Sequence, residues 1–200
     1  LFRSILDALI MRNRIVEDIM AYKEANGLQI LQPEQEAKQK EWLEKRMEGR
    51  RHKDEVSDVF ECIRTNSKRI QARKLFDYNI VLIGFMGTGK STISDFLKNV
   101  FAMDVAEMDQ IIAQRQGMSI SDIFETYGEQ YFRNLETNLL IEMQSRSNVV
   151  ISCGGGTPMR ECNVVEMKKN GRVVLLTAKP ETILDRVKDN HDRPIGRAHV

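Results

Sequence analysis

The sequence predicts a two-domain protein, in which an all-helical segment, residues 1–76, precedes an α/β domain, residues 77–200, built on a parallel sheet. Three observations predict this class. Up to about residue 74, apolar residues recur every three or four positions, which is typical of amphipathic helices. Short β-rich runs then alternate with helix-like stretches, which favours parallel strands joined by helical crossovers. A glycine-rich segment directly follows the first of these runs.

Composition narrows the functional classes. With 42% hydrophobic and 30% charged residues among 200, the chain fits one large or two small well-solvated domains. Its longest apolar runs fall far below the ~18 to 20 residues that cross a bilayer, so we expect a cytoplasmic protein without membrane association. A net charge of +1 gives no support to a nucleic-acid-binding surface. The cysteines, Cys62, Cys153 and Cys162, lack metal-site spacing, and we expect reduced thiols.

Three helices are expected in the first segment. A long first helix ends at the glycine of "ANG", residues 25–27, and a second begins at "LQPEQE" with Pro33 in its first turn and ends near Gly49. A third spans about residues 55–74. The first helix is indicated by apolar residues at three- and four-residue spacing, namely Ile5, Leu6, Leu9, Ile10, Val16, Ile19 and Met20. The inner side of the third helix is expected to carry Val56, Val59, Phe60, Ile63, Ile70 and Leu75.

The second segment is expected to hold four strands, in "NIVLIGF", "FAMDVAEMD", "NVVISCGGG" and "RVVLLTA". Between and after them we expect a helix from Lys90, one near residues 110–116, further helices through residues 121–146, one around residues 161–169 and a last one from Pro180. This alternation is the basis for the parallel sheet.

Residues 84–91, "GFMGTGKS", fit the phosphate-binding pattern G-x-x-x-x-G-K-[ST] in the required place between a strand and a helix. Glycines let the backbone wrap around phosphates, and the following helix N-terminus favours their negative charge. A plain tight turn would need neither the lysine nor three glycines together. The segment therefore predicts binding of a nucleotide and Mg²⁺, with Lys90 on the β- and γ-phosphates, Ser91 on the metal, and a nucleotide site formed by Gly87, Thr88, Gly89, Lys90, Ser91 and Thr92.

Further motifs follow in order: "EMDQII", "GEQYFRNLE", "SCGGGTP" and "DRP". Together with "IGFMGTGKST", they resemble shikimate kinase, a member of the nucleoside monophosphate kinase-like group, from Asn79 to the end of the chain. The resemblance implies ATP-dependent phosphorylation of the shikimate 3-hydroxyl. Taken singly, Asp109 is typical of a helix cap, Arg133 with Glu136 of a surface pair, and a triple glycine of a loop.

The resemblance also implies roles for these residues. Asp109 would accept a hydrogen bond and then the proton from the attacking hydroxyl, and Arg133, oriented by Glu136, would hold the substrate carboxylate. Arg186 and Arg193 would belong to a lid over ATP that excludes water. Backbone amides would lie against the substrate ring at three positions where a side chain would collide: Gly154, Gly155 and Gly156.

The sequence differs from the shikimate kinase pattern at two places, and two other functions are compatible with it. Glu107 occupies a place near the magnesium ion where the family usually has aspartate, and the family's second substrate arginine would lie beyond Val200. We expect the chain to be a fragment at both ends. A different small-molecule kinase would keep the nucleotide loop, and a nucleotide-binding module with a non-catalytic helical dimerisation domain would bind ATP without turnover.

In the helical segment, Arg12 and Lys23 are eleven residues apart, which at ~100° per residue places both cations on one face of a helix. Such a pair suits a dianion. The stretch "DALIMRNRIVEDIMAYKEANGLQILQPEQE" resembles the all-helical chorismate mutase family, and the likeness covers about Leu1 to Leu75. It implies conversion of chorismate to prephenate, with Arg12 on a carboxylate, Lys23 and Gln71 on the ether oxygen, Glu36 on the ring hydroxyl and Ser67 as a further contact.

This rearrangement needs only a restricted conformation and electrostatic stabilisation. The family often has aspartate and arginine where this chain has Gln32 and Gln35, and an arginine that it lends to the partner's site would precede Leu1. We therefore expect slow or no mutase turnover from residues 1–200 alone and Lys23-dependent turnover from a chain extended upstream. Because about 75 helical residues bury little apolar surface, we also expect a homodimer formed through this segment.

Overall fold

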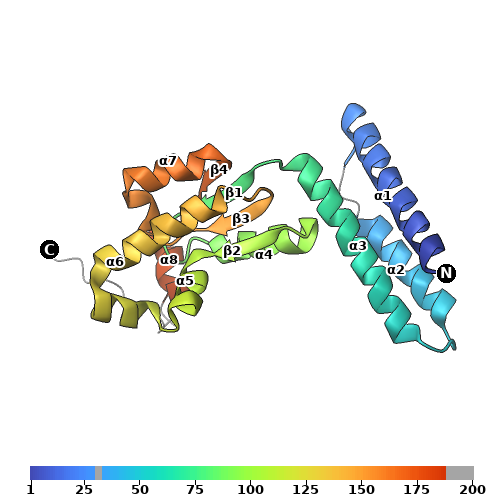
Figure 1. Ribbon diagram of the computed structural model, residues 1–200, viewed down its shortest axis with the longest axis horizontal. Coiled ribbons are helices and arrows are strands. Elements are labelled where there is room, and N and C mark those ends of the chain that lie inside the picture. Colours follow the sequence, from blue (N-terminus) through green and yellow to red (C-terminus); the bar gives the residue numbers. More distant parts are fainter. Residues whose placement is uncertain (30–32, 188–200) are drawn as a thin grey trace. The chain divides into compact units, whose positions relative to one another are not determined.

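The computed structural model describes residues 1–29 and 33–187 (Figure 1). They form two compact units, of which the first is Leu1–Leu75 and the second is the rest of the chain from Phe76 apart from Val100–Ala102. An α-helical unit followed by an α/β unit is the predicted fold class, which is confirmed. No described helix is long and apolar enough to span a membrane.

The helical unit contains α1 (Phe2–Ala25), α2 (Pro33–Met47) and α3 (Lys53–Leu75), and α1 packs against α3. Acidic residues occupy the first turns of α2 and α3 and basic residues their last turns, so both helices complement their own dipoles. The three helices match the expected ones within a few residues.

The inner side expected for the third helix is only partly buried in the single chain. Val59, which was expected there, is 57% exposed, and Phe60 is 38% exposed. Among the described residues of α1 to α3, the buried apolar side chains are only Met20, Leu43, Met47 and Ala72. Three helices enclose a narrow core, so much of each apolar stripe remains in contact with water.

The α/β unit follows the predicted alternation. Its strands are β1 (Asn79–Ile83), β2 (Asp104–Glu107), β3 (Val149–Ser152) and β4 (Gly171–Leu175). All pair in parallel in the order β2-β3-β1-β4. Its helices are α4 (Lys90–Phe101), α5 (Met108–Gln116), α6 (Ile120–Met143), the short η1 (Thr157–Met159), α7 (Glu161–Lys169) and α8 (Pro180–Val187).

The sheet has one continuous core. All four residues of β3 are buried, as expected for a run of apolar residues in a central parallel strand. Side chains of α5, α6 and α7, among them Ile112, Leu140 and Met167, pack in the same cluster as Val81 and Ile151 of the strands. This core fixes the strand ends, where β1, β2 and β3 lead into the segments that carried the sequence motifs.

A turn within α6 separates its two halves. Ser119 and Asp122 form a capping box at its start, in which Asp122 N donates to Ser119 Oγ at 3.1 Å. At Gly128 the backbone takes φ 82°, so the helical path is interrupted there. Side chains on both sides of this turn, Ser121 before it and Arg133 after it, consequently line the same pocket.

Candidate active sites of the two units

The glycine-rich loop joins β1 to α4 and has the conformation that its sequence requires. Gly84, Gly87 and Gly89 have φ of 141°, 76° and 100°, a region that side chains rarely tolerate. A Cβ at Gly84 would also collide with the carbonyl oxygen of Leu176. The three glycines are therefore needed for the backbone path itself.

Lys90 and the residues after it begin α4. The Lys90 ammonium donates to the carbonyl oxygens of Gly84 at 2.7 Å and Phe85 at 3.0 Å, which holds it over the loop. Thr88 Oγ1 donates to Phe85 O at 2.8 Å. Ser91 and Thr92 lie in the first turn of α4 with their side chains exposed. The expected nucleotide-binding residues thus surround one helix N-terminus, a place that favours phosphate.

Arg186 reaches this loop from α8. Its Nη1 donates to the carbonyl oxygen of Gly87 at 2.9 Å. A cation from a helix about a hundred residues later in the chain therefore lies at the predicted nucleotide site, as expected. Arg193, the other expected lid residue, lies outside the described residues.

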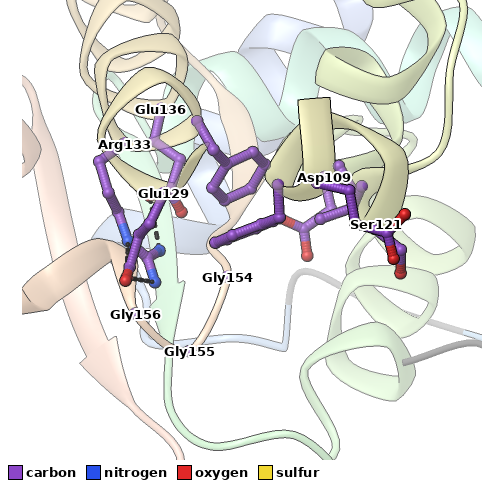
Figure 2. Close-up of a pocket in the computed structure, with 12 residues that line it drawn as sticks. Asp109, Ser121, Glu129, Arg133, Glu136, Gly154, Gly155 and Gly156 are labelled. Carbon is purple, nitrogen blue, oxygen red and sulfur yellow. Dashed lines mark hydrogen bonds and ion pairs between the residues drawn. The ribbon is translucent and has the colours of Figure 1, made fainter. Parts of the chain in front are cut away.

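A pocket of about 490 Å³ lies at the same edge of the sheet (Figure 2). Figure 2 shows Arg133 and Glu136 on one side of it and Asp109 with Ser121 on the other. The structure thus gathers all the predicted acceptor-site residues in one place. The complete lining is Asp109, Ile120, Ser121, Phe124, Glu125, Glu129, Phe132, Arg133, Glu136, Gly154, Gly155 and Gly156.

Arg133 is fixed by two carboxylates. Its Nη1 donates to Glu136 Oε2 at 2.8 Å, and its Nε and Nη2 donate to Glu129 Oε1 at 3.1 and 3.0 Å. Burial opposes the charge of the guanidinium, but the hydrogen bonds and charges of Glu136 and Glu129 outweigh it and raise the pKa of Arg133. The guanidinium is consequently held in one orientation as a permanent cation, ready for a two-pronged contact with a carboxylate.

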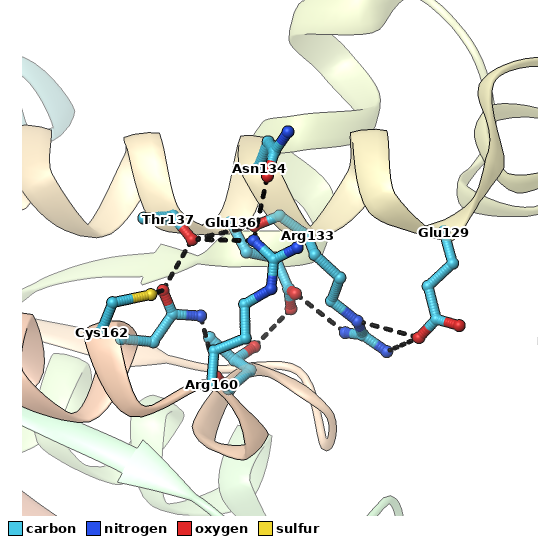
Figure 3. A network of polar contacts seen from close by, with 9 residues as sticks. Glu129, Arg133, Asn134, Glu136, Thr137, Arg160 and Cys162 are labelled. Carbon is cyan, nitrogen blue, oxygen red and sulfur yellow. Dashed lines mark hydrogen bonds and ion pairs between the residues drawn. The ribbon is translucent and has the colours of Figure 1, made fainter.

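Glu136 is fully buried and anchors a wider network (Figure 3). Thr157, directly after the triple glycine, donates its hydroxyl to Glu136 Oε1. Asn163 of α7 donates from Nδ2 to Thr157 O at 2.9 Å and accepts from Thr137 Oγ1 at 2.7 Å. The glycine loop is thereby tied to α6, the helix that carries Arg133.

The three glycines differ in what requires them. A Cβ at Gly154 would lie 3.0 Å from Asp109 Oδ1, and one at Gly156 would lie 2.5 Å from Arg133 Nη2. At Gly155 the nearest atom, Gly84 O, would be 3.8 Å away. Two of the glycines therefore make room for side chains of the protein itself, which adds to the expected reason, room for a substrate.

Cys153 ends β3 directly before these glycines and is buried. Burial, reinforced by the negative charges of Glu136 and Glu107, raises its pKa to about 12 against a smaller opposite effect of Lys90. The residue is therefore a neutral thiol at physiological pH and fills space rather than acting as a nucleophile.

The helical unit has its own pocket, of about 400 Å³. All five residues expected there line it: Arg12, Lys23, Glu36, Ser67 and Gln71. Arg12 Nη1 donates to Ser67 Oγ, and this hydroxyl donates to Ile63 O at 2.9 Å. Burial lowers the pKa of Arg12. Gln35 also lines the pocket, whereas Gln32 lies outside the described residues.

Sequence reasoning missed several polar residues in both pockets. In the α/β unit these are Glu129, which accepts a hydrogen bond from Arg133, and Thr157, which donates one to Glu136. In the helical pocket they are Gln39, Arg64 and Lys68. Helical spacing could have identified most of them, since Arg64, Lys68 and Gln71 repeat every three or four residues as the expected contacts do. Thr157 carries no such signal.

Comparison with known proteins assigns each unit. The shikimate kinase family model matches residues 86–199, and the model of chorismate mutase type II matches residues 3–72. The shikimate kinase of Caldanaerobacter subterraneus is 41% identical over 117 residues, which are 58% of this chain and 68% of that protein. That of a Sulfurihydrogenibium species is 44% identical over 117 residues, 58% of this chain and 70% of the relative.

Solved structures agree with the assignment of the α/β unit. The shikimate kinase from Acinetobacter baumannii in complex with shikimate superposes with a TM-score of 0.57 at 34% identity, over 61% of this chain and 68% of that one. The enzyme from Aquifex aeolicus gives a TM-score of 0.53 at 38% identity, over 61% and 73% of the two chains. Residues 3–72 are similar to chorismate mutase type II, and the chain belongs to the shikimate kinase family.

Proposed function

We propose that the α/β unit transfers the γ-phosphoryl group of ATP to the 3-hydroxyl of shikimate. One observation carries this proposal: Asp109, the glycine loop and Arg133, which is paired with two glutamates, line one pocket. The pocket lies at the edge of the sheet that also bears the nucleotide loop. Ligands of open parallel sheets bind at this edge. Membership of the shikimate kinase family supports the choice of acceptor.

In this reaction the hydroxyl oxygen forms a bond to the γ-phosphorus while the bond from that phosphorus to the bridging oxygen breaks, leaving ADP. Asp109 orients the hydroxyl and takes its proton, and Lys90 stabilises the negative charge on the transferred group. Arg133 binds the shikimate carboxylate and so sets the ring at the correct distance. Arg186 covers the loop and helps to exclude water, with Arg193 proposed for the same task.

Two side chains at the carboxyl ends of the strands have the chemistry that suits a magnesium ion. Ser91 offers a hydroxyl in the first turn of α4, and Glu107 ends β2 with a half-buried carboxylate, so both supply the oxygen atoms that Mg²⁺ prefers. When bound together with the nucleotide, the ion would neutralise phosphate charge. Ser91 would hold it directly, and the longer Glu107 through a bound water.

For the helical unit we propose conversion of chorismate to prephenate. One observation favours it: the five residues expected from the mutase resemblance, drawn from three helices, line a single pocket. Arg12 would bind a carboxylate, Lys23 and Gln71 would donate to the ether oxygen as its charge grows, and Glu36 would contact the ring hydroxyl. Ser67 fixes Arg12 through its hydroxyl.

We further propose that the helical unit forms a homodimer. Its support is the exposed apolar stripe, on which Ile5, Leu6 and Ile10 of α1 are each 45% to 56% exposed, and which a second copy would cover. Sedimentation of the full-length protein tests this, and a monomer at micromolar concentration would contradict it. Cytoplasmic action is proposed with it, because ATP and both proposed substrates are water-soluble metabolites.

The kinase proposal is tested by measuring ADP release from the full-length protein with shikimate and with other hydroxylated carboxylic acids. The proposal predicts turnover with shikimate at least a hundredfold above the other acids. Turnover with a different acid would indicate another small-molecule kinase. ATP binding without transfer to any acceptor would indicate a non-catalytic nucleotide-binding module.

A further inference from the structure

One wall of the helical pocket is a single stripe of α3. Arg64, Lys68 and Gln71 recur at four- and three-residue spacing, Ser67 directly precedes Lys68, and all four line the pocket. Ser67 and Gln71 are already part of the proposed mutase site. Lys68 lies between them on the same face and has no role in the chemistry described so far.

The charges of the pocket show what Lys68 adds. Among the described residues that line it, four are cations, Arg12, Lys23, Arg64 and Lys68, and one is a carboxylate, Glu36. Arg64 forms an ion pair with Glu61, one turn earlier on α3, so its charge is compensated locally. The lining therefore carries more cations than carboxylates, as expected of a site for a dicarboxylate. Neutralising Lys68 would remove one of these cations.

The geometry of Lys68 suits a shared role. Its Nζ lies 2.9 Å from Glu36 Oε2, and its side chain is only 25% exposed, so its charge is screened less than that of a surface lysine. An ammonium has three N–H donors, and its pairing with one carboxylate oxygen leaves donors for another anion. Lys68 can therefore bind a ligand carboxylate and hold Glu36 at the same time.

We propose that Lys68 is a substrate-binding residue of the helical pocket, which contacts one carboxylate of the dianion and orients Glu36 toward the ring hydroxyl. This inference rests on the proposed mutase function. It extends the recognition of the dianion from the α1 cations, Arg12 and Lys23, to a residue of α3.

Chorismate binding to the full-length protein, measured by calorimetry, tests the proposal. Lys68→Ala should weaken binding about ten- to thirtyfold at low salt, with a smaller difference at high salt, because the lost contact is between partly exposed charges. Lys74→Ala is the matched control, since Lys74 is an exposed lysine on the same helix that does not line the pocket. It should bind chorismate as the unaltered protein does.

A rescue separates binding from a merely structural role. Gln35 lines the pocket from α2, next to Glu36, so an arginine there would return a cation to the same cavity. Gln35→Arg combined with Lys68→Ala should recover most of the lost affinity, and Lys68→Arg alone should keep it. If circular dichroism shows that Lys68→Ala loses helix, Lys68→Gln replaces it, because glutamine keeps the length of the stem and removes the charge.

The outcomes distinguish this inference from the function on which it rests. If the unaltered protein does not bind chorismate, the mutase proposal fails and this inference fails with it. If the unaltered protein binds and the neutral Lys68 variant binds equally well, only the inference is overturned. A folded neutral variant whose weakened binding is restored by neither arginine would likewise overturn it.

Discussion

Both pockets hold cations suited to carboxylates, but they support those cations differently. In the α/β unit, Arg133 is backed by Glu136, which is fully buried and hydrogen-bonded to Thr157. In the helical unit, the Lys68 and Glu36 side chains that face each other are 25% and 44% exposed. The first site is organised before any ligand arrives, whereas the second consists of longer side chains that water still reaches.

The difference follows from how much apolar surface each unit buries. A four-stranded parallel sheet with helices packed on it encloses a core, and its strand ends can hold charged groups in fixed positions. Three helices in one chain leave much of their apolar surface exposed. We therefore expect variants of the α/β site to affect chemistry sharply, and the helical site to depend on the partner chain as well as on its own residues.

The largest effect is expected for Lys90→Met. Removal of the cation that stabilises the transferred phosphoryl group should lower kcat for shikimate phosphorylation about a thousandfold or more, without loss of folding. Lys98→Met, on an exposed face of the same helix, is the control and should leave kcat within twofold. Steady-state kinetics of both variants would measure this, and near-normal turnover of Lys90→Met would contradict the proposed role of the loop.

A smaller effect is expected for Arg133→Ala. The shikimate carboxylate would lose its cationic partner, and the buried Glu136 would lose its ion pair. Shikimate binding should therefore weaken by about 2 to 4 kcal/mol, whereas ATP binding should be kept. Arg115→Ala is a fair comparison, because Arg115 also pairs with a glutamate in two hydrogen bonds, but at the surface. Calorimetry with each ligand measures the outcome. Equal losses of both affinities would point to misfolding or to another acceptor.

The glycine loop offers a finer test of how rigid the α/β site is. Gly156→Ala should displace the Arg133 guanidinium, raise KM for shikimate about tenfold and lower stability by about 1 kcal/mol, because its Cβ would overlap that group. Gly155→Ala meets no protein atom closer than 3.8 Å, so it should leave stability unchanged and affect KM only through the substrate. KM and thermal unfolding of the pair measure the difference. Equal destabilisation by both changes would contradict the geometry.

The smallest effect concerns buried and exposed thiols. Burial raises the pKa of Cys153 from 9.0 to about 12, so the thiolate is disfavoured in the folded protein. Its contribution to stability is complete below pH 9 and is lost as the pH rises toward 12. From pH 8 to pH 10, the free energy of unfolding measured in urea should fall by about 1 kcal/mol more for the unaltered protein than for Cys153→Ala. Cys62→Ala removes an exposed thiol of the helical unit, so its free energy of unfolding should fall over this pH range as much as that of the unaltered protein.

Most of the fold could be predicted from the sequence, because periodicity and glycine placement are local signals. The order of helices and strands and the loop from Gly84 follow from them directly. The exposure of Val59 could not be predicted, since an apolar stripe indicates a face that avoids water without saying which chain covers it.

In the sites, too, some residues could be predicted from the sequence and others could not. Asp109, Arg133 and the glycines carried motif signals, and Lys23 and Gln71 followed from the mutase resemblance. Thr157 and Asn163 became visible only in three dimensions, because buried hydrogen bonds between distant segments leave no periodic trace. The requirement for glycine at 154 and 156 also needed the positions of Asp109 and Arg133.

We propose that one chain holds two anion-recognising active sites that act independently of each other. A crossed comparison of two variants tests this most directly. Shikimate phosphorylation and chorismate turnover are measured for the full-length protein, for Lys90→Met and for Lys23→Ala. We expect Lys90→Met to lose phosphorylation and keep mutase turnover within twofold, and Lys23→Ala to do the reverse with a loss of about a hundredfold or more. Full mutase turnover after Lys23→Ala, or the loss of both activities in either folded variant, would contradict the account.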